Sequence, residues 1–121
     1  MFKVGQRVWV KPLKEFGIVE VLIDYREVIY FVNFDDKEGN TFQENDLHET
    51  ADDMFERLGY LDQGGDEWHH DKLNKNIYFD VDKTISCYSY HENIPTVRNE
   101  SMTIDEFKAS YQMCIEKGWI E

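Results

Sequence analysis

The sequence predicts an α+β fold in which a small β-barrel, residues 1–49, precedes a separate α+β unit, residues 50–121. Three observations lead to this expectation. Short apolar runs rich in valine and aromatic residues alternate with polar turns over the first fifty residues. Further along, two alternating runs flank the turn residues Asp82-Lys83, as in a β-hairpin. A well-capped helical pattern then closes the chain.

The first fifty residues contain four or five short predicted strands. Val8 and Val10 alternate with polar neighbours, Gly17 opens a second apolar run, and residues 28–34 form a third. Strands this short and closely spaced favour a strongly bent barrel. Over roughly residues 3–49 the order of features resembles the SH3-like barrels of the Tudor and KOW kind: Gly5-Gln6-Arg7-Val8, Gly17-Ile18-Val19, Tyr30-Phe31-Val32-Asn33-Phe34-Asp35, and Phe42 with Asp46-Leu47.

The middle of the chain is predicted to hold a short helix and a β-hairpin. Asp52 and Asp53 follow a capping hydroxyl at Thr50, which indicates a helix start, and Gly59 is expected to end that helix. The hairpin is expected to pair residues 77–81 with residues 84–90. Around it we expect a further strand over 68–70 at the sheet edge, and loops over 62–67 and 91–100.

The last helix has the clearest sequence signals. Thr103 is expected to cap it, with Glu106 completing a capping box. Phe107, Tyr111, Cys114 and Ile115 recur at helical spacing, so we expect these four side chains to form the face that packs on the core.

The charge of the chain restricts its partners. The net charge is −12, with 10 acidic and 6 basic residues in positions 1–50 and 15 acidic and 7 basic residues in positions 51–121. Direct binding to nucleic acid is disfavoured, because that affinity comes largely from lysine and arginine. A basic partner is favoured instead, although solubility alone also explains an acidic surface. Two cysteines and no long apolar run favour a reduced, cytoplasmic setting.

Two patterns are weighed as chemistry and set aside. Tyr78 to Thr84 resembles the first motif of haloacid dehalogenase-type phosphotransferases, but fewer than forty residues follow it, too few to build their doubly wound sheet. His69 and His70 are adjacent on a predicted strand and so point to opposite faces, which does not suit one metal ion. We therefore expect no enzyme, no cofactor and no metal.

Two sets of residues are the candidates for partner binding. Carboxylates at predicted turns form the acidic set, and a row of them along a strand would imitate phosphates. Aromatic residues near the barrel turns form the second set; they would bind a cation or a peptide, or pack between the two units. The acidic set is Asp24, Glu27, Asp35, Asp36, Glu38, Asp62, Asp66 and Glu67, and the aromatic set is Trp9, Tyr25 and Tyr30.

Residues 53–121 resemble a set of small phage and prophage proteins of Gram-positive bacteria. The resemblance rests on Met54 to Tyr60, Ile77 to Tyr88, Met102 to Glu106, and the closing run Cys114 to Trp119. The resemblance implies a phage or prophage setting. By analogy of size, charge and origin with small acidic phage inhibitors, we expect a non-enzymatic accessory protein of the anti-CRISPR or anti-restriction type that binds and inhibits a basic nucleic-acid-binding protein of the host. The alternative is an adaptor that binds through the barrel aromatics, with the acidic charge incidental.

Overall fold

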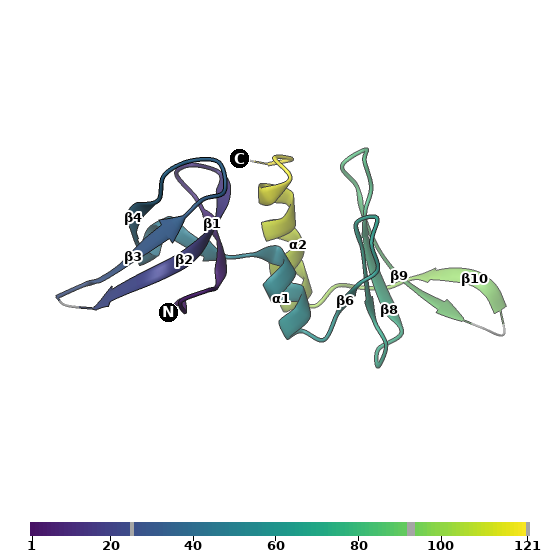
Figure 1. The fold of residues 1–121 in the computed structure, drawn as a ribbon. Coiled ribbons are helices and arrows are strands. Elements are labelled where there is room, and N and C mark those ends of the chain that lie inside the picture. The colour runs from purple at the N-terminus through teal and green to yellow at the C-terminus, as the bar shows by residue number, and fades with distance from the viewer. Residues whose placement is uncertain (25, 92–93, 121) are drawn as a thin grey trace. The chain divides into compact units, whose positions relative to one another are not determined.

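The computed structural model describes residues 1–24, 26–91 and 94–120. The fold is α+β, with two helices and two five-stranded antiparallel sheets among these residues (Figure 1). The chain divides into two compact units, Met1–Thr50 and Ala51–Glu121, which we describe separately. Neither described helix has the length and apolar character needed to cross a membrane.

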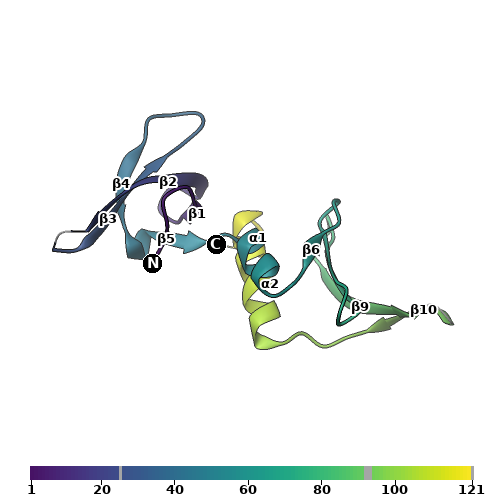
Figure 2. The same ribbon diagram turned by 60° about the horizontal axis from the view of Figure 1, so that its bottom comes forward.

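The N-terminal unit is a single antiparallel sheet with strand order β4-β3-β2-β1-β5 (Figure 2). β1, β2 and β3 each pair with the next strand along the chain, and β5 returns to pair with β1. The sheet is open, with β4 and β5 at its edges, so the predicted closed barrel is not confirmed. The elements are β1 (Arg7–Val10), β2 (Glu15–Asp24), β3 (Val28–Asn33), β4 (Asn40–Gln43), the 3₁₀ turn η1 (Glu44–Asp46) and β5 (Leu47–Glu49).

Alternation along these strands builds the core of the N-terminal unit. Every second side chain of a strand faces the same side, and those that face inwards here are Val8, Val10, Val19, Tyr30 and Val32, all fully buried. Gly17 belongs to the same side of the sheet. A Cβ atom there would lie 2.4 Å from Cγ1 of Val32, so only glycine allows β2 to approach β3 this closely.

The C-terminal unit places two helices beside a second antiparallel sheet with strand order β10-β9-β8-β7-β6. Its core centres on Phe55, which stacks on Trp68 at a ring-centre distance of 5.0 Å and meets Phe79 edge-on. The elements are α1 (Ala51–Arg57), β6 (Leu61–Asp62), β7 (Glu67–His70), β8 (Lys75–Phe79), β9 (Ile85–His91), β10 (Ile94–Asn99) and α2 (Ile104–Glu116).

The predicted hairpin is confirmed, and the sheet around it is larger than expected. β8 pairs with β9 from Phe79↔Ile85 to Asn76↔Tyr88. The segment expected as a loop over 62–67 is instead a tight turn between β6 and β7, because Gly64, Gly65 and Asp66 all adopt positive φ angles. β7 therefore lies inside the sheet and not at its edge.

The prediction of a loop over residues 91–100 is also wrong, because strand β10 lies there and pairs with β9. The loop was predicted partly because Pro95 lies in this segment. Proline is nevertheless tolerated in an edge strand, where its missing N–H removes no hydrogen bond between strands. β10 is such an edge strand, and its register with β9 shifts between Ile94 and Val97.

Helix α2 begins as predicted but turns a different face to the core. The Thr103 hydroxyl accepts from the Glu106 amide (3.1 Å), and the Glu106 carboxylate accepts from the Thr103 amide (2.8 Å), so the capping box is confirmed. Phe107 and Tyr111 are 57% and 50% exposed, and the predicted apolar face is wrong for both. The buried residues are Glu106, Ala109, Ser110, Gln112 and Cys114.

Candidate functional site

The five predicted acids of the N-terminal unit lie in two groups at opposite ends of β3. Asp24 ends β2 and Glu27 precedes β3, so both stand at the β2–β3 turn. Asp35, Asp36 and Glu38 occupy the loop between β3 and β4. All five are exposed, and within the described part of the chain none of these carboxylates forms a hydrogen bond or ion pair.

The loop between β3 and β4 contains one basic residue among its acids. Lys37 pairs with Glu15 at 2.7 Å, and its ammonium lies 5.2 Å from the centre of the Phe34 ring. Lys37 is therefore engaged with the first residue of β2. The neighbouring carboxylates of Asp35, Asp36 and Glu38 are exposed to solvent.

Five acids of the C-terminal unit, including its three predicted site residues, lie at one end of its sheet. Asp62 ends β6, Asp66 lies in the β6–β7 turn, Glu67 begins β7, and the β8–β9 turn carries Asp80 and Asp82. Because β7 pairs antiparallel with β8, these two turns lie at the same end of the sheet (Figure 1). We call these five residues the acidic end. The acids thus gather at turns and strand ends, and not as the row along one strand that phosphate imitation was expected to use.

Several carboxylates of the acidic end also support the local structure. Asp62 accepts from the Gly64 amide at 2.8 Å, and Asp66 pairs with Lys117 at 2.8 Å. Asp82 accepts from the Thr84 hydroxyl at 2.6 Å, which stabilises the hairpin turn. Their charge is consequently divided between holding turns and facing solvent, whereas the five predicted acids of the N-terminal unit form no ion pair with a described residue.

Glu67 accepts a hydrogen bond from the hydroxyl of Tyr88 on β9. Burial, together with this bond and the negative charge of Glu67, raises the pKa of Tyr88 to about 12. Tyr88 therefore stays protonated at neutral pH and holds the Glu67 carboxylate in place beside the turn.

The aromatic candidates are mostly enclosed. Tyr30 is fully buried in the N-terminal core, where its hydroxyl accepts from the Phe2 amide (3.1 Å) and donates to Glu44 (3.2 Å). Burial raises the pKa of Tyr30, and its ring is not available to an incoming ligand. Trp9 is also buried and meets Phe16 edge-on, with ring centres 4.9 Å apart. Tyr25 lies outside the described residues.

A shallow hollow of about 60 Å³ lies beside Phe16. The Arg7 guanidinium stands 4.0 Å from the centre of the Phe16 ring, in a cation–π arrangement. The hollow is lined by Arg7, Phe16, Gly17, Ile18, Asn33 and Asp35. Of the predicted site residues it includes only Asp35.

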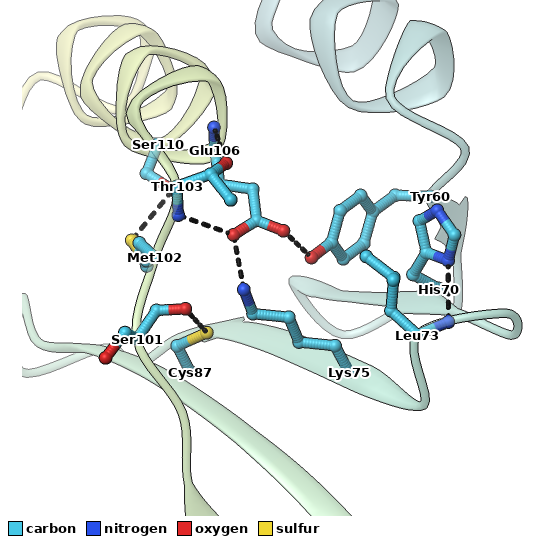
Figure 3. Close-up of polar contacts among 10 residues, drawn as sticks. All are labelled: Tyr60, His70, Leu73, Lys75, Cys87, Ser101, Met102, Thr103, Glu106 and Ser110. Carbon is cyan, nitrogen blue, oxygen red and sulfur yellow. Dashed lines mark hydrogen bonds and ion pairs between the residues drawn. The ribbon is translucent and has the colours of Figure 1, made fainter.

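The sequence did not predict the buried polar cluster under α2 (Figure 3). Glu106, only 3% exposed, accepts from Lys75 Nζ at 2.5 Å and from the Tyr60 hydroxyl at 2.5 Å. Burial acts to raise the pKa of Glu106, but the hydrogen bonds from Lys75 and Tyr60 outweigh it and leave this pKa below its ordinary value. The capping box identified Glu106 in the sequence, but nothing in the spacing showed that its side chain would be buried.

This polar cluster is a structural clamp. It joins the start of α2 through Glu106, strand β8 through Lys75, and the segment after α1 through Tyr60. Burial raises the pKa of Tyr60 most, with Glu106 adding to the effect. Cys87 lies beside the clamp, and burial raises the pKa of its thiol despite the nearby Lys75, which keeps it a weak nucleophile.

The two histidines considered as metal ligands have separate partners. His69 contacts Asn76 Oδ1 through Nδ1 (2.7 Å) and Asp71 Oδ1 through Nε2 (2.9 Å). His70 accepts from the Leu73 amide at 3.2 Å and packs edge-on against Tyr60. Within residues 1–24, 26–91 and 94–120 no group of three or more His, Cys, Asp or Glu side chains is arranged to hold a metal ion.

Comparison with known proteins identifies no relative: no family model, no curated protein and no solved structure matches the chain.

Proposed function

We propose that this chain is a non-enzymatic accessory protein of a phage or prophage that acts in the cytoplasm of its bacterial host. It binds a basic nucleic-acid-binding protein, such as a guide-directed nuclease or a restriction enzyme, and excludes the nucleic acid from it. The resemblance of residues 53–121 to small phage proteins supports the phage origin, and the acidic surface supports competition with nucleic acid for a basic partner.

The observation that carries this proposal is that the five predicted acids of the N-terminal unit are exposed and form no ion pair with a described residue. A carboxylate already held by a lysine has little attraction left for a partner, whereas an unpaired one attracts lysine and arginine at full strength. Asp35 and Asp36 are exposed neighbours, and neither is paired within the described residues. With a net charge of −12 behind them, they steer a basic groove towards this unit.

The acidic end of the C-terminal unit supports the same function. Neighbouring strands lie about 4.8 Å apart, so two turns at one end of a sheet hold their carboxylates close together. Such a group competes with phosphate for the same arginine and lysine side chains. Lys117 offsets part of this charge through its pair with Asp66.

We further propose that the N-terminal unit is an open relative of the SH3-like barrels. The meander from β1 to β4, with β5 returning beside β1, supports this relation. So does the register shift between Val19 and Val21, because a bulge bends a strand and increases its twist.

An adaptor that binds through aromatic residues is the second candidate, and the hollow beside Phe16 favours it. Under this alternative, Phe16→Leu abolishes partner binding while removal of the acids changes little. Because Tyr30 is fully buried, its substitution would unfold the unit and cannot serve as the test.

Capture from a Gram-positive host lysate, followed by competition with nucleic acid, tests the proposed function. The wild-type chain is expected to retain a basic nucleic-acid-binding protein, identified by mass spectrometry. The purified partner should release a labelled nucleic acid when the chain is added, and binding should weaken as salt rises, because ions screen exposed charges.

Two variants that remove the same amount of charge make this test specific. Asp35→Asn with Asp36→Asn removes two unpaired acids of the N-terminal unit, whereas Glu56→Gln with Asp105→Asn removes two exposed acids of the helices. The first pair should weaken binding about five- to tenfold, at roughly 0.5–0.7 kcal/mol for each well-placed charge, and the second pair about twofold. A captured partner that keeps its nucleic acid in the presence of the chain would refute the proposal.

A further inference from the structure

The outward side of the N-terminal sheet carries an exposed apolar patch. Val21 and Ile23 on β2 are 46% and 45% exposed, although both are fully apolar. Their cross-strand partners on β3 are Phe31 and Ile29, which are half-buried. We call these four residues together with Ile18 the outer patch.

Strand register places the members of the outer patch on the same side. Val19 faces the core opposite Val32, and the register shift that follows lets Val21 face outwards opposite Phe31. Ile23 and Ile29 form the next outward pair. Directly opposed side chains in an antiparallel sheet stand about 5 Å apart, so the patch is continuous across β2 and β3.

Acids border this patch at both ends. Asp24 and Glu27 stand at the β2–β3 turn, beside Ile23 and Ile29. At the other end the Phe31 ring lies over Gly39, where an added Cβ would meet it at 2.7 Å, so the patch reaches the loop that carries Glu38. The six residues of β3 separate the two groups by roughly 20 Å.

We propose that the outer patch docks an extended segment of the partner whose centre is apolar and whose two ends are basic. This inference rests on the proposed function and names the chemistry of the partner that this surface recognises. Charge complementarity selects the occupant: lysines or arginines at the ends of the segment meet the two acid groups, and apolar side chains cover the patch.

The same charges disfavour the other occupants. A second copy of the chain would bring acids against acids at both ends of the patch and carries a net charge of −12 itself. An anionic membrane surface is repelled for the same reason. A wholly basic segment would satisfy the acids but leave Val21 and Ile23 in contact with charge.

A pair of synthetic peptides provides the probe. The first is about ten residues long, with two lysines at each end and leucines alternating with serines between them, so that the leucines share one side of an extended chain. In the second, serine replaces each leucine and the lysines stay. Binding of both to the full chain is measured by fluorescence anisotropy at one salt concentration, and amide chemical shifts locate the contact.

The wild-type chain is expected to bind the leucine peptide at least about tenfold more tightly than the serine peptide, because burying leucine side chains adds to the same charge attraction. Shifts should concentrate in residues 18–31. Val21→Thr with Ile23→Thr keeps β-branched residues in the strand and should abolish the preference. Val81→Thr, at a position 91% exposed in the other unit, should leave it unchanged.

Equal binding of the two peptides, or a preference that persists in the Val21→Thr, Ile23→Thr variant, would overturn the inference. The outcomes also distinguish a failure of this inference from a failure of the proposed function. If both peptides bind equally and the captured host protein still loses its nucleic acid, the acids act without the patch. If the leucine preference holds but no nucleic acid is displaced, the patch is supported as a docking surface and the inhibitory function is refuted.

Discussion

Lys75 Nζ lies 2.5 Å from Glu106 Oε1 at a site where the two side chains are 12% and 4% exposed. The pair joins β8 to the first turn of α2, and the Tyr60 hydroxyl and the Thr103 amide donate two further hydrogen bonds to the carboxylate. A buried charge is tolerated only when it is paired and hydrogen-bonded, so each partner depends on the other.

We expect Glu106→Ala to destabilise the C-terminal unit by about 3–5 kcal/mol, because it leaves the Lys75 ammonium buried without a counter-charge. Urea unfolding followed by circular dichroism measures the loss. The double variant Lys75→Met, Glu106→Leu should recover part of it, since apolar groups of similar volume need no partner. A single-variant cost under about 1 kcal/mol would show that the pair does not hold the helix.

Acid should weaken this unit through Glu106. Its pKa in the folded chain lies below the ordinary 4.5, so the unfolded chain takes up the proton first as the pH falls. The stabilisation is therefore complete above about pH 4.5 and is lost as the pH falls further, through the folded pKa. Melting temperatures between pH 3 and 7 should show a steeper fall for the wild type than for Glu106→Gln, and identical slopes would contradict this assignment.

The exposed side of α2 should tolerate substitution. Phe107→Ser is expected to change the free energy of unfolding by no more than about 0.5 kcal/mol, because the side chain is 57% exposed. Ala109→Leu, on the buried side, should cost about 1–3 kcal/mol by overpacking. Chemical denaturation of both variants compares the two faces directly. If Phe107→Ser lowered the free energy of unfolding more than Ala109→Leu, the side of α2 that carries Phe107 would be the one that packs on the core.

Gly17→Ala should loosen the N-terminal sheet. Its new Cβ would lie 2.4 Å from Val32 Cγ1 and 3.0 Å from the Phe34 ring, so β2 and β3 must separate, at a cost of about 1–3 kcal/mol. Hydrogen exchange read by mass spectrometry should accelerate in residues 15–34 and stay unchanged in residues 61–90. Unchanged protection in β2 and β3 would mean that the packing around Gly17 relaxes without cost.

The sequence predicted those elements whose signals are local. The Thr103 capping box and the Asp82-Lys83 hairpin each depend on a few adjacent residues, and both are confirmed. The open N-terminal sheet could not be inferred in this way, because closure depends on how β4 and β5 lie, not on the residues within either strand. The prediction of a loop around Pro95 was wrong for a related reason, because a proline disrupts a sheet only when its strand is not at the edge.

The orientation of α2 also depends on contacts that are distant in the sequence. Its apolar spacing pointed to Phe107 and Tyr111 as core residues, whereas the helix buries Glu106 and Ser110. A hydrophobic pattern cannot reveal that Lys75 and Tyr60, 31 and 46 positions away along the chain, complete the bonding of Glu106. Of the candidate acids, Asp24, Asp62 and Glu67 lie at strand ends and the others lie in turns. Their division into groups at the ends of β3 and of the second sheet depends on strand pairing, which the sequence does not show.

The five acids around β3 stand outside the core, and none is engaged by another side chain within the described residues. Their identities are therefore decoupled from folding. A lineage of such proteins can gain, lose or reposition these carboxylates one at a time while the valine interior stays fixed. The scaffold therefore tolerates sequence changes at these turns without disturbing the valine interior.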